Sequence, residues 1–227
     1  MKEVLCIVFS IIFSYLLGSI NSAITVCRIW KHKDIRDYGS NNAGLTNVLR
    51  VFGKGPALAT LLCDLAKGVL AVVICRIVVT HVFDVVYFDN KLFIGYIAGL
   101  AVMIGHIFPI FYGFHGGKGV LITATTLLAI DPLTCLLSVS VFALVLFLTK
   151  YVSVGSICAA IAYPIFTVIT QSLRDIDACW INAGMACIFS VMIVFMHRSN
   201  IKRLLNGTEN KFGSKNKTNT EEETENG

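Results

Sequence analysis

Three glycines surround one lysine in the segment Gly116-Gly117-Lys118-Gly119, which lies between two apolar stretches. Glycine allows successive backbone N–H groups to turn towards one point without a steric penalty, and the lysine adds a positive charge. These features are typical of a cradle for a phosphate or another oxyanion. A tight turn between two helices, with a lysine that extends to the membrane surface, is the alternative for this motif taken alone.

A second polar segment, residues 34–50, is rich in Gly, Ser, Asn and Thr. Its hydroxyl, amide and guanidinium groups are good hydrogen-bond donors to an anion, and an arginine can contact a phosphate through two N–H groups. A capped turn before a short helix would use the same residue types, so the segment alone leaves both interpretations open. The candidate ligands are Ser40, Asn42, Thr46, Asn47 and Arg50.

A third polar cluster follows the last apolar stretch and contains His197, Asn200 and Glu209. His197 and Asn200 are three residues apart and therefore share one face of a helix. The nearby Arg198 and Lys202 are expected to lower the pKa of His197, which favours its neutral, proton-accepting form. Arg198, Lys202 and Arg203 could equally act as juxtamembrane anchors.

The composition shows which elements must carry these clusters. The chain has 227 residues, of which 56% are hydrophobic and 15% charged, and its mean hydropathy is +0.74. A soluble domain of this size needs more polar surface, so the protein is expected to be an integral membrane protein. A membrane-spanning helix needs about 17–25 residues. Seven apolar windows qualify as candidates: 4–26, 56–80, 92–112, 120–130, 133–148, 153–170 and 178–196.

The window 120–130 is too short to span a membrane alone. Asp131-Pro132 separates it from the next window: one helix is expected to end at this pair, and Pro132 favours the first turn of the next helix. We therefore predict two short helices joined by a tight turn. The expected fold is an all-α bundle of about seven transmembrane helices. Small residues repeat every four positions in the first window and are expected to face a neighbouring helix. They are Ser10, Ser14, Gly18 and Ser22.

Lysine and arginine are distributed asymmetrically between the two ends of these windows. By the positive-inside rule, the N-terminus is expected outside and the C-terminus in the cytoplasm. Cleavage of the first window as a signal peptide is the alternative, but it would leave a strongly basic segment outside. The cytoplasmic segments would carry Arg28, Lys31, Lys33, Arg36, Arg50, Lys54, Lys118, Lys150, Arg198, Lys202, Arg203, Lys211, Lys215 and Lys217, and the outer segments Lys2, Lys91 and Arg174.

This topology gives one membrane domain over residues 1–212 and a disordered cytoplasmic tail over 213–227, which contains only polar residues between Gly213 and the final glycine. The positive charge indicates contact with membrane lipid and not with nucleic acid. Asp64 and Lys67 lie within the second window, where charged groups are unfavourable unless paired. We expect these two residues to neutralise each other and to have a structural role.

The polar clusters all fall on the same side of the membrane in this topology. Donors for phosphate that converge at a membrane face predict a site that joins a water-soluble anion to a lipid-soluble tail. In their order along the chain, the clusters resemble the motifs of the bacterial acyl-phosphate glycerol-3-phosphate acyltransferases. The resemblance extends over residues 1–212, and its motifs are residues 39–47, 105–120, 153–156 and 197–209.

The sequence departs from that family at three positions. Asn41 replaces the usual glycine, and an asparagine tolerates the left-handed conformation that the turn requires. Leu45 replaces a usual alanine in the same motif. Leu121 replaces the usual alanine just after the glycine-rich segment, and its bulk could narrow a path for an acyl chain.

The resemblance implies transfer of a fatty acyl group from acyl phosphate to the 1-hydroxyl of glycerol 3-phosphate, giving lysophosphatidic acid and phosphate. It also implies a bacterial inner-membrane location, a cytoplasmic active site, no cofactor and no metal, and it leaves open the enzyme that makes acyl phosphate as a partner. Mapped onto this chain, the expected catalytic residues are Ser40, Arg50, Lys118, His197 and Asn200. The expected phosphate-binding residues are Asn42, Thr46, Asn47, Gly116, Gly117 and Gly119, and Glu209 is expected to be structural together with Asp64 and Lys67.

Three groups are candidates for the base that removes the hydroxyl proton: His32, His197 and a phosphate oxygen of a bound substrate. His32 and Asp37 fit the His-x4-Asp pattern of another acyltransferase class, but that class has a largely soluble α/β domain, so we attribute the match to coincidence. We favour the substrate phosphate, with His197 as a positioning group. A transporter or lipid-binding membrane protein for an anionic phosphorylated substrate is the alternative function, although the windows show no internal repeat.

Overall fold

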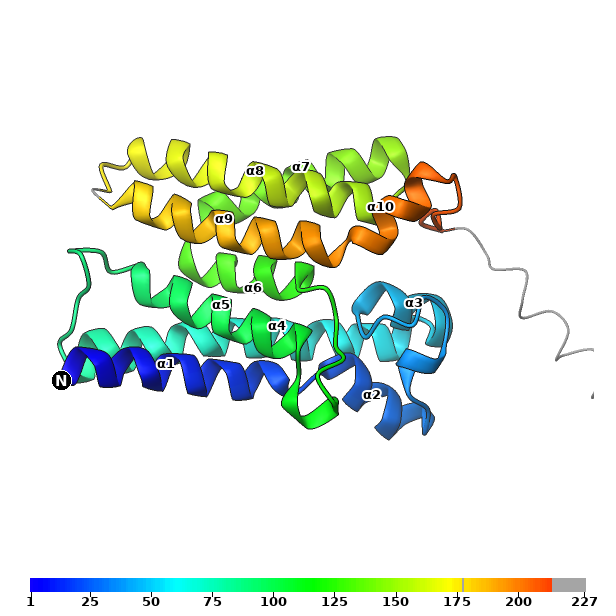
Figure 1. Cartoon of the computed structure of the whole chain (residues 1–227), viewed down its shortest axis with the longest axis horizontal. Coiled ribbons are helices and arrows are strands. Elements are labelled where there is room, and N and C mark those ends of the chain that lie inside the picture. The colour runs from blue at the N-terminus through cyan, green and yellow to red at the C-terminus, as the bar shows by residue number, and fades with distance from the viewer. Residues whose placement is uncertain (177, 214–227) are drawn as a thin grey trace, which may run out of the picture.

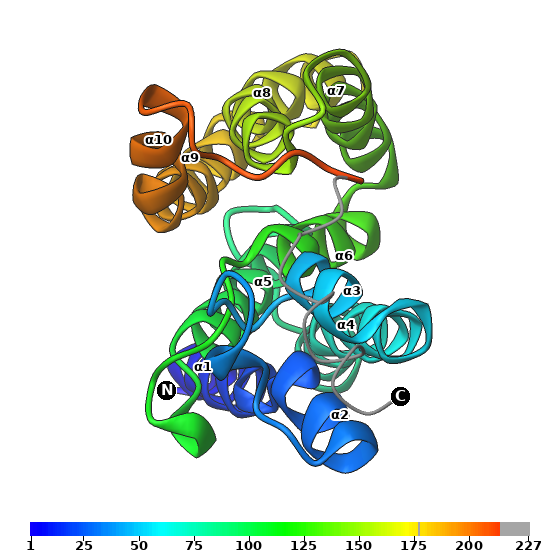
Figure 2. The same cartoon turned by 90° about the vertical axis from the view of Figure 1, so that its right-hand side faces the viewer.

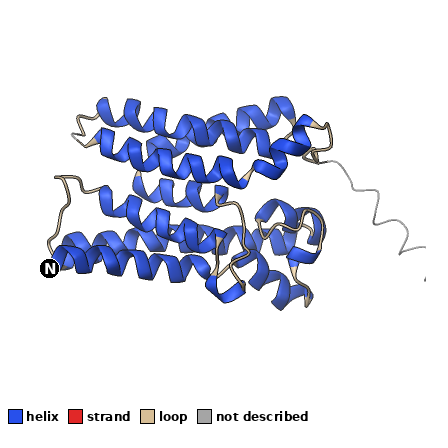
Figure 3. Cartoon of the chain, in the orientation of Figure 1, coloured by secondary structure: helices blue, strands red, loops and turns tan. Residues whose placement is uncertain are grey.

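The computed structural model describes residues 1–176 and 178–213, which fold into helices joined by turns and loops (Figures 1 and 3). The all-α architecture predicted from the sequence is confirmed for these residues. Beyond residue 213, the predicted tail lies outside the described residues. The α-helices are α1 (Lys2–Ser19), α2 (Ser22–Lys31), α3 (Leu45–Phe52), α4 (Lys54–Arg76), α5 (Phe93–Ile107), α6 (Val120–Ile130), α7 (Pro132–Thr149), α8 (Val152–Ser172), α9 (Cys179–Met196) and α10 (Arg198–Leu205).

Six helical segments of the described chain are long and apolar enough to cross a membrane. The first combines α1 with α2, the second continues α4 through a π-helical turn to Val82, and the others contain α5, α7, α8 and α9. The remaining apolar helix, α6, has 11 residues and rises only about 16 Å, roughly half of a hydrocarbon core about 30 Å thick. The predicted helix at 120–130 therefore exists, while the number of full crossings and their orientation stay predictions.

The long helices run along one common axis, with the N-terminus at one end of the bundle and α10 at the other (Figure 1). Seen along that axis, α7 to α10 form one group and α1 to α6 form another (Figure 2). Helices α2 and α3 lie at the same end as α10. The end of the bundle that carries α2, α3 and α10 therefore holds the polar segments that the sequence singles out.

Close packing of α1 on α5 depends on two glycines. A Cβ atom at Gly18 would lie 2.9 Å from the Val102 Cα, and one at Gly105 would lie 2.9 Å from the Ser19 backbone nitrogen. The predicted contact face of small residues in the first window is confirmed, because Ser10, Ser14, Gly18 and Ser22 are all buried. Backbones can approach this closely in a membrane only where side chains are small.

The break between α6 and α7 forms as the sequence predicts. The Asp131 side chain accepts a hydrogen bond of 3.3 Å from the Thr134 N–H, and Pro132 occupies the first turn of α7, where its missing N–H has no effect. At its other end, α6 starts well short of the bundle end that carries α3 and α10 (Figure 1). The short helix therefore begins inside the bundle and not at that end.

Candidate functional site

A cavity of about 390 Å³ lies between the two groups of helices. Polar residues of α3, the glycine-rich segment, α10 and the chain that follows α10 line one end, and apolar residues of α6, α7 and α8 line the rest. We call it the central cavity. All the site residues predicted from the sequence line it except Gly116, Gly117 and Lys67; they are Ser40, Asn42, Thr46, Asn47, Arg50, Asp64, Lys118, Gly119, His197, Asn200 and Glu209.

A chain of hydrogen bonds joins the lysine of the glycine-rich segment to the C-terminal polar cluster. Lys118 Nζ donates to Asn200 Oδ1, and Asn200 Nδ2 donates to Glu209 Oε1 over 2.7 Å. Glu209 also accepts from Ser153 Oγ at 2.9 Å and from Arg203 Nε at 2.7 Å. Glu209 therefore holds one side chain of α8 and two of α10 in place.

The electrostatics of this end favour an anion. Burial lowers the pKa of Lys118 to about 8, and the positive charges of Arg203 and Arg50 act in the same direction while Glu209 opposes them. Burial would also raise the pKa of Glu209, but hydrogen bonds from Asn200, Arg203 and Ser153 hold it below its usual value. Three cations thus gather near one carboxylate that is already fully engaged.

The N-terminus of α6 adds donors to the same end. No side chain caps α6, whose first residues, Val120 and Leu121, line the central cavity directly after Lys118 and Gly119. The free N–H groups of a first helical turn and the helix dipole both attract negative charge. Gly119 has a φ of 83°, a left-handed conformation that places the start of the helix at the cavity.

The prediction that Gly116 and Gly117 donate N–H groups to a phosphate is not supported by their contacts. The Gly116 N–H donates to the Ile107 carbonyl at 3.0 Å, and the Gly117 N–H donates to the His106 carbonyl at 3.1 Å. A Cβ at Gly117 would collide with the His106 imidazole and lie 2.8 Å from the Ala43 carbonyl oxygen. Both glycines are needed because the segment folds back tightly onto the end of α5, and they position Lys118.

Asn47 is likewise a residue that shapes its loop. Its side chain is 2% exposed, and its Nδ2 lies 2.9–3.3 Å from the carbonyl oxygens of Ile35, Tyr38 and Asn42. Its Oδ1 accepts the Ser40 N–H at 3.0 Å. An amide with this many internal partners has little capacity left for a ligand, so the predicted phosphate contact of the Asn47 side chain is corrected to a positioning role.

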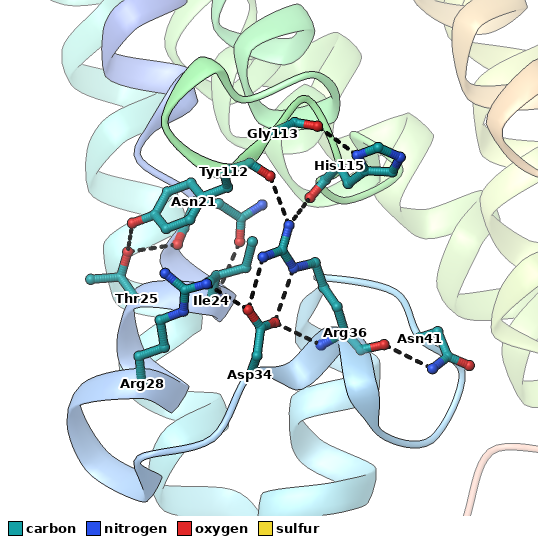
Figure 4. A network of polar contacts seen from close by, with 10 residues as sticks. All are labelled: Asn21, Ile24, Thr25, Arg28, Asp34, Arg36, Asn41, Tyr112, Gly113 and His115. Atoms are coloured by element: carbon teal, nitrogen blue, oxygen red, sulfur yellow. Dashed lines mark hydrogen bonds and ion pairs between the residues drawn. The ribbon is translucent and has the colours of Figure 1, made fainter.

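The loop around Ser40 is fastened to the glycine-rich segment by Arg36 (Figure 4). Its Nη1 donates to the Tyr112 carbonyl at 2.7 Å and to the His115 carbonyl at 3.3 Å, and its Nη2 pairs with Asp34 at 2.8 Å. Hydrogen bonds from Arg36 hold the pKa of the Asp34 carboxyl well below its usual range. Asn41 follows with a φ of 56°, the left-handed conformation that the sequence predicted it to tolerate.

Asp64 and Lys67 form the expected ion pair, 2.9 Å apart, with side chains that are 1% and 6% exposed. Lys67 Nζ also donates to the Ile20 carbonyl at 3.0 Å and lies 3.3 Å from His106 Nδ1. A positive charge at the C-terminal end of α1 is favourable there because the last carbonyls of that helix need partners. The Asp64–Lys67 pair therefore stabilises the break between α1 and α2. It also holds His106, which packs against Gly117.

His197 is neutral at physiological pH. Burial lowers its pKa to about 4, and the charge of Lys118 contributes, although the backbone of Ile193 and the charge of Glu209 oppose the shift. The predicted direction is right but the predicted cause is wrong, because Arg198 and Lys202 are not responsible. His197 Nδ1 lies 2.8 Å from the Ile193 carbonyl oxygen, to which only an N–H can donate, so Nε2 is left as an acceptor.

Sequence reasoning missed three residues of this site. Ser153 and Arg203 hold Glu209, although the sequence analysis gave neither side chain a role in the site. His106 lines the central cavity and is 4% exposed, although a buried histidine in an apolar helix gave no specific signal. Conversely, His32 is exposed at the C-terminus of α2 and does not line the central cavity.

Comparison with known proteins agrees with the family resemblance found in the sequence. Residues 8–207 match the family model described as glycerol-3-phosphate acyltransferase. Proteins of that name from Chlorobaculum tepidum and Halalkalibacterium halodurans are 39% and 41% identical to this chain, with 91% and 92% of this chain and 97% and 96% of theirs covered.

Two solved structures share the fold. The integral membrane glycerol 3-phosphate acyltransferase PlsY in its glycerol 3-phosphate form is 33% identical, with a TM-score of 0.77 over 91% of this chain and 96% of that one. Its lysophosphatidic acid form is 31% identical, with a TM-score of 0.74 over 91% and 95%. The order of the motifs, the central cavity and these similarities agree, and the chain belongs to the glycerol-3-phosphate acyltransferase family.

Proposed function

We propose that this protein transfers a fatty acyl group from acyl phosphate to the 1-hydroxyl of glycerol 3-phosphate. The hydroxyl oxygen attacks the acyl carbonyl carbon, an ester bond forms, and the bond between that carbon and the phosphate oxygen breaks. The hydroxyl proton leaves with the phosphate, so the products are lysophosphatidic acid and inorganic phosphate. Membership of the family supports acylation of glycerol 3-phosphate, and the choice of donor rests on the shape and charge of the central cavity.

The observation that carries the proposal is the division of one cavity into two chemical halves. Cations, amides and the N-terminus of α6 surround its polar end, whereas α6, α7 and α8 supply an apolar remainder. A phosphorylated substrate with a fatty chain needs both halves at once. An acyl phosphate also contains its own leaving group, so the protein must chiefly align the reactants and stabilise negative charge.

The residues at the polar end can divide these tasks. Lys118 and the first turn of α6 can hold a phosphate, and Arg50 and Ser40 line the same polar end of the central cavity. Asn200 has its amide fixed between Lys118 and Glu209, so it keeps Lys118 in place. The cations stabilise the charge that gathers on the departing phosphate.

His197 orients the attacking hydroxyl in this proposal. With its proton on Nδ1, Nε2 can accept a hydrogen bond from the 1-hydroxyl of glycerol 3-phosphate. A pKa of about 4 makes His197 a weak base at neutral pH, whereas a phosphate oxygen becomes more basic as its bond to carbon breaks. The proton therefore goes to the departing phosphate, and His197 aligns the hydroxyl for attack.

We further propose that the polar end of the central cavity faces the bacterial cytoplasm. This end carries Arg28 of α2, Arg36 of the segment between α2 and α3, and Arg198 and Lys202 of α10, as the positive-inside rule requires of the cytoplasmic side. Both water-soluble molecules, glycerol 3-phosphate and inorganic phosphate, would then enter and leave at that side. The N-terminus, at the opposite end of the bundle, would lie outside.

The donor can be tested with purified protein in detergent. Labelled glycerol 3-phosphate is incubated in parallel with acyl phosphate, acyl-coenzyme A and an acyl-carrier-protein thioester of the same chain. We expect lysophosphatidic acid with acyl phosphate and none with either thioester. Turnover with a thioester but not with acyl phosphate would refute the proposed donor while leaving the acylation of glycerol 3-phosphate intact.

A further inference from the structure

The apolar half of the central cavity is built from three helix faces that converge away from the polar end. Along α8, the lining residues Ser156, Ala160 and Tyr163 recur at helical spacing, and Tyr163 lies about 15 Å from Ser153 at 1.5 Å per residue. Helix α6 contributes residues down to Leu127, and α7, which runs in the opposite direction, contributes Cys135 at the same depth. The cavity therefore has a deep end opposite the phosphate donors.

The deep end is closed, although the middle of the cavity is not. Tyr163 and Leu127 are each 2% exposed, whereas Val139 on the α7 wall is 43% exposed. The Tyr163 ring packs edge-on against Phe189 of α9, with the ring centroids 5.9 Å apart. The ring is held by this contact and lies across the end of the apolar space, where it limits the depth of the cavity.

Polar groups lie beyond Tyr163. Farther along α8, Gln171 donates to the Tyr96 hydroxyl at 3.2 Å and to Asp131 Oδ2 at 3.0 Å, and it accepts from Asn182 at 2.8 Å. Gln171, Tyr96 and Asn182 are fully buried. An alkyl chain that entered this region would separate buried hydrogen-bonded groups, which is strongly unfavourable. The chain must therefore end at Tyr163 if it stays inside the protein.

The Tyr163 hydroxyl makes no hydrogen bond of normal geometry among the described residues, although the Tyr96 hydroxyl lies near it. A hydroxyl without such a bond contributes little to the fold that phenylalanine would lose. The barrier at the deep end is consequently the aromatic ring and not the hydroxyl. Two substitutions distinguish the ring from the hydroxyl: Tyr163→Phe keeps the ring and removes the hydroxyl, whereas Tyr163→Ala removes both.

We propose that Tyr163 sets the greatest length of acyl chain that the enzyme accepts. The inference rests on the proposed function, since it places the fatty chain of the substrate in the apolar half of the central cavity. The phosphate end fixes one terminus of the substrate and Tyr163 meets the other. A chain longer than this space must bend, displace the Tyr163 ring or leave through the α7 wall. In each case the acyl carbonyl group loses its alignment with the 1-hydroxyl of glycerol 3-phosphate.

The test measures kcat/KM for a series of acyl phosphates of increasing length. In the wild type, each methylene beyond the limiting length should lower kcat/KM by about 10- to 200-fold, the range for one methylene in a hydrophobic pocket. Tyr163→Ala should move the limit to longer chains, and Tyr163→Phe should leave it unchanged. Ile165→Ala, on the exposed face of the same helix, is the matched control and should also leave it unchanged.

A second variant covers the case in which Tyr163→Ala fails to fold. Ala159 lines the cavity about one turn above Tyr163, so Ala159→Leu should fill the deep end and move the limit to shorter chains. The proposal is overturned if chain preference is the same in the wild type, Tyr163→Ala and Ala159→Leu. That result would mean that the chain leaves through the α7 wall into the lipid.

Binding of lysophosphatidic acids of graded length to the same variants keeps this inference separate from the choice of donor. If acyl phosphate gives no turnover in any protein, but Tyr163→Ala binds longer lysophosphatidic acids than the wild type, the proposed donor is wrong and the role of Tyr163 stands. If acyl phosphate is the donor and neither turnover nor binding shifts with Tyr163→Ala or Ala159→Leu, the role of Tyr163 is wrong and the proposed function stands.

Discussion

Replacing Glu209 by glutamine tests whether this carboxylate organises the polar end of the central cavity. Glutamine keeps an oxygen that can accept from Asn200 and Ser153, but it removes the charge that Arg203 and Lys118 experience. The substitution is nearly isosteric, so it removes the charge and replaces the oxygen that accepts from Arg203 Nε with an NH2 group, without a change of shape. A carboxylate that only fastens the chain after α10 would tolerate the change.

The magnitude follows from the contacts. A hydrogen bond to a charged group contributes about 1.5–3 kcal/mol, against about 0.5–1.5 kcal/mol for a neutral one. Because 34% of the Arg203 side chain is exposed, solvent screens its pair with Glu209 and we take the low end for that bond. The loss of alignment at Lys118 and Asn200 should then amount to about 1–2 kcal/mol, or about a 5- to 30-fold fall in kcat/KM for glycerol 3-phosphate.

The assay is steady-state kinetics over a range of pH, with thermal unfolding as a check on the fold. Glu209 raises the pKa of Lys118, so its removal should lower that pKa further and make KM for glycerol 3-phosphate rise at a lower pH than in the wild type. Glu3→Gln, at the opposite end of the bundle, removes a carboxylate as a control. An unchanged kcat/KM and pH profile in Glu209→Gln would refute the reasoning.

The further predictions concern the same site and its orientation. Lys118→Ala should lose about 2.7–4 kcal/mol of transition-state stabilisation, seen as about a hundred- to a thousandfold lower turnover, while the exposed Lys202→Ala stays near wild type. Gly117→Ala should also be strongly impaired in the same assay, because the new methyl group displaces His106, and normal turnover would show that the segment is only a turn. In the wild type, KM for glycerol 3-phosphate should rise as pH passes about 8 and Lys118 loses its proton, and a flat profile would contradict the role of its charge. His197→Ala should be strongly impaired but measurable and His32→Ala nearly silent, whereas inactivity of a folded His32 variant would mean that His32 takes part in the reaction and would contradict the proposed mechanism. A cysteine at Lys211 should resist labelling from outside intact cells, and ready labelling would refute the proposed orientation.

The architecture was predictable because its signals are local. Hydrophobic windows of sufficient length give the long helices, and the Asp131-Pro132 pair gives the break before α7 through one side-chain bond to the next turn. The split of the first window into α1 and α2 was not predicted. It depends on Asn21, whose side chain caps α2, and on Lys67 from a distant helix, which satisfies the carbonyls that the break exposes.

The residue types of the site were predictable, but their separate tasks were not. Asn47 and Asn200 are both amides in polar motifs, and only the fold shows that the first holds its own loop while the second contacts Lys118. Gly116 and Gly117 have the composition of a phosphate cradle, yet their N–H groups are already paired with the end of α5. Such contacts join residues far apart in the chain, and no local pattern encodes them.

The central claim is that one cavity holds the phosphate at one end and the acyl chain at the other. The most direct measurement is an experimental structure of this protein with bound lysophosphatidic acid. We predict its phosphate group within hydrogen-bond distance of Lys118 and the first turn of α6, with the chain running between α6, α7 and α8 towards Tyr163. A phosphate group bound elsewhere, or a chain that lies outside these three helices in the lipid, would contradict the account.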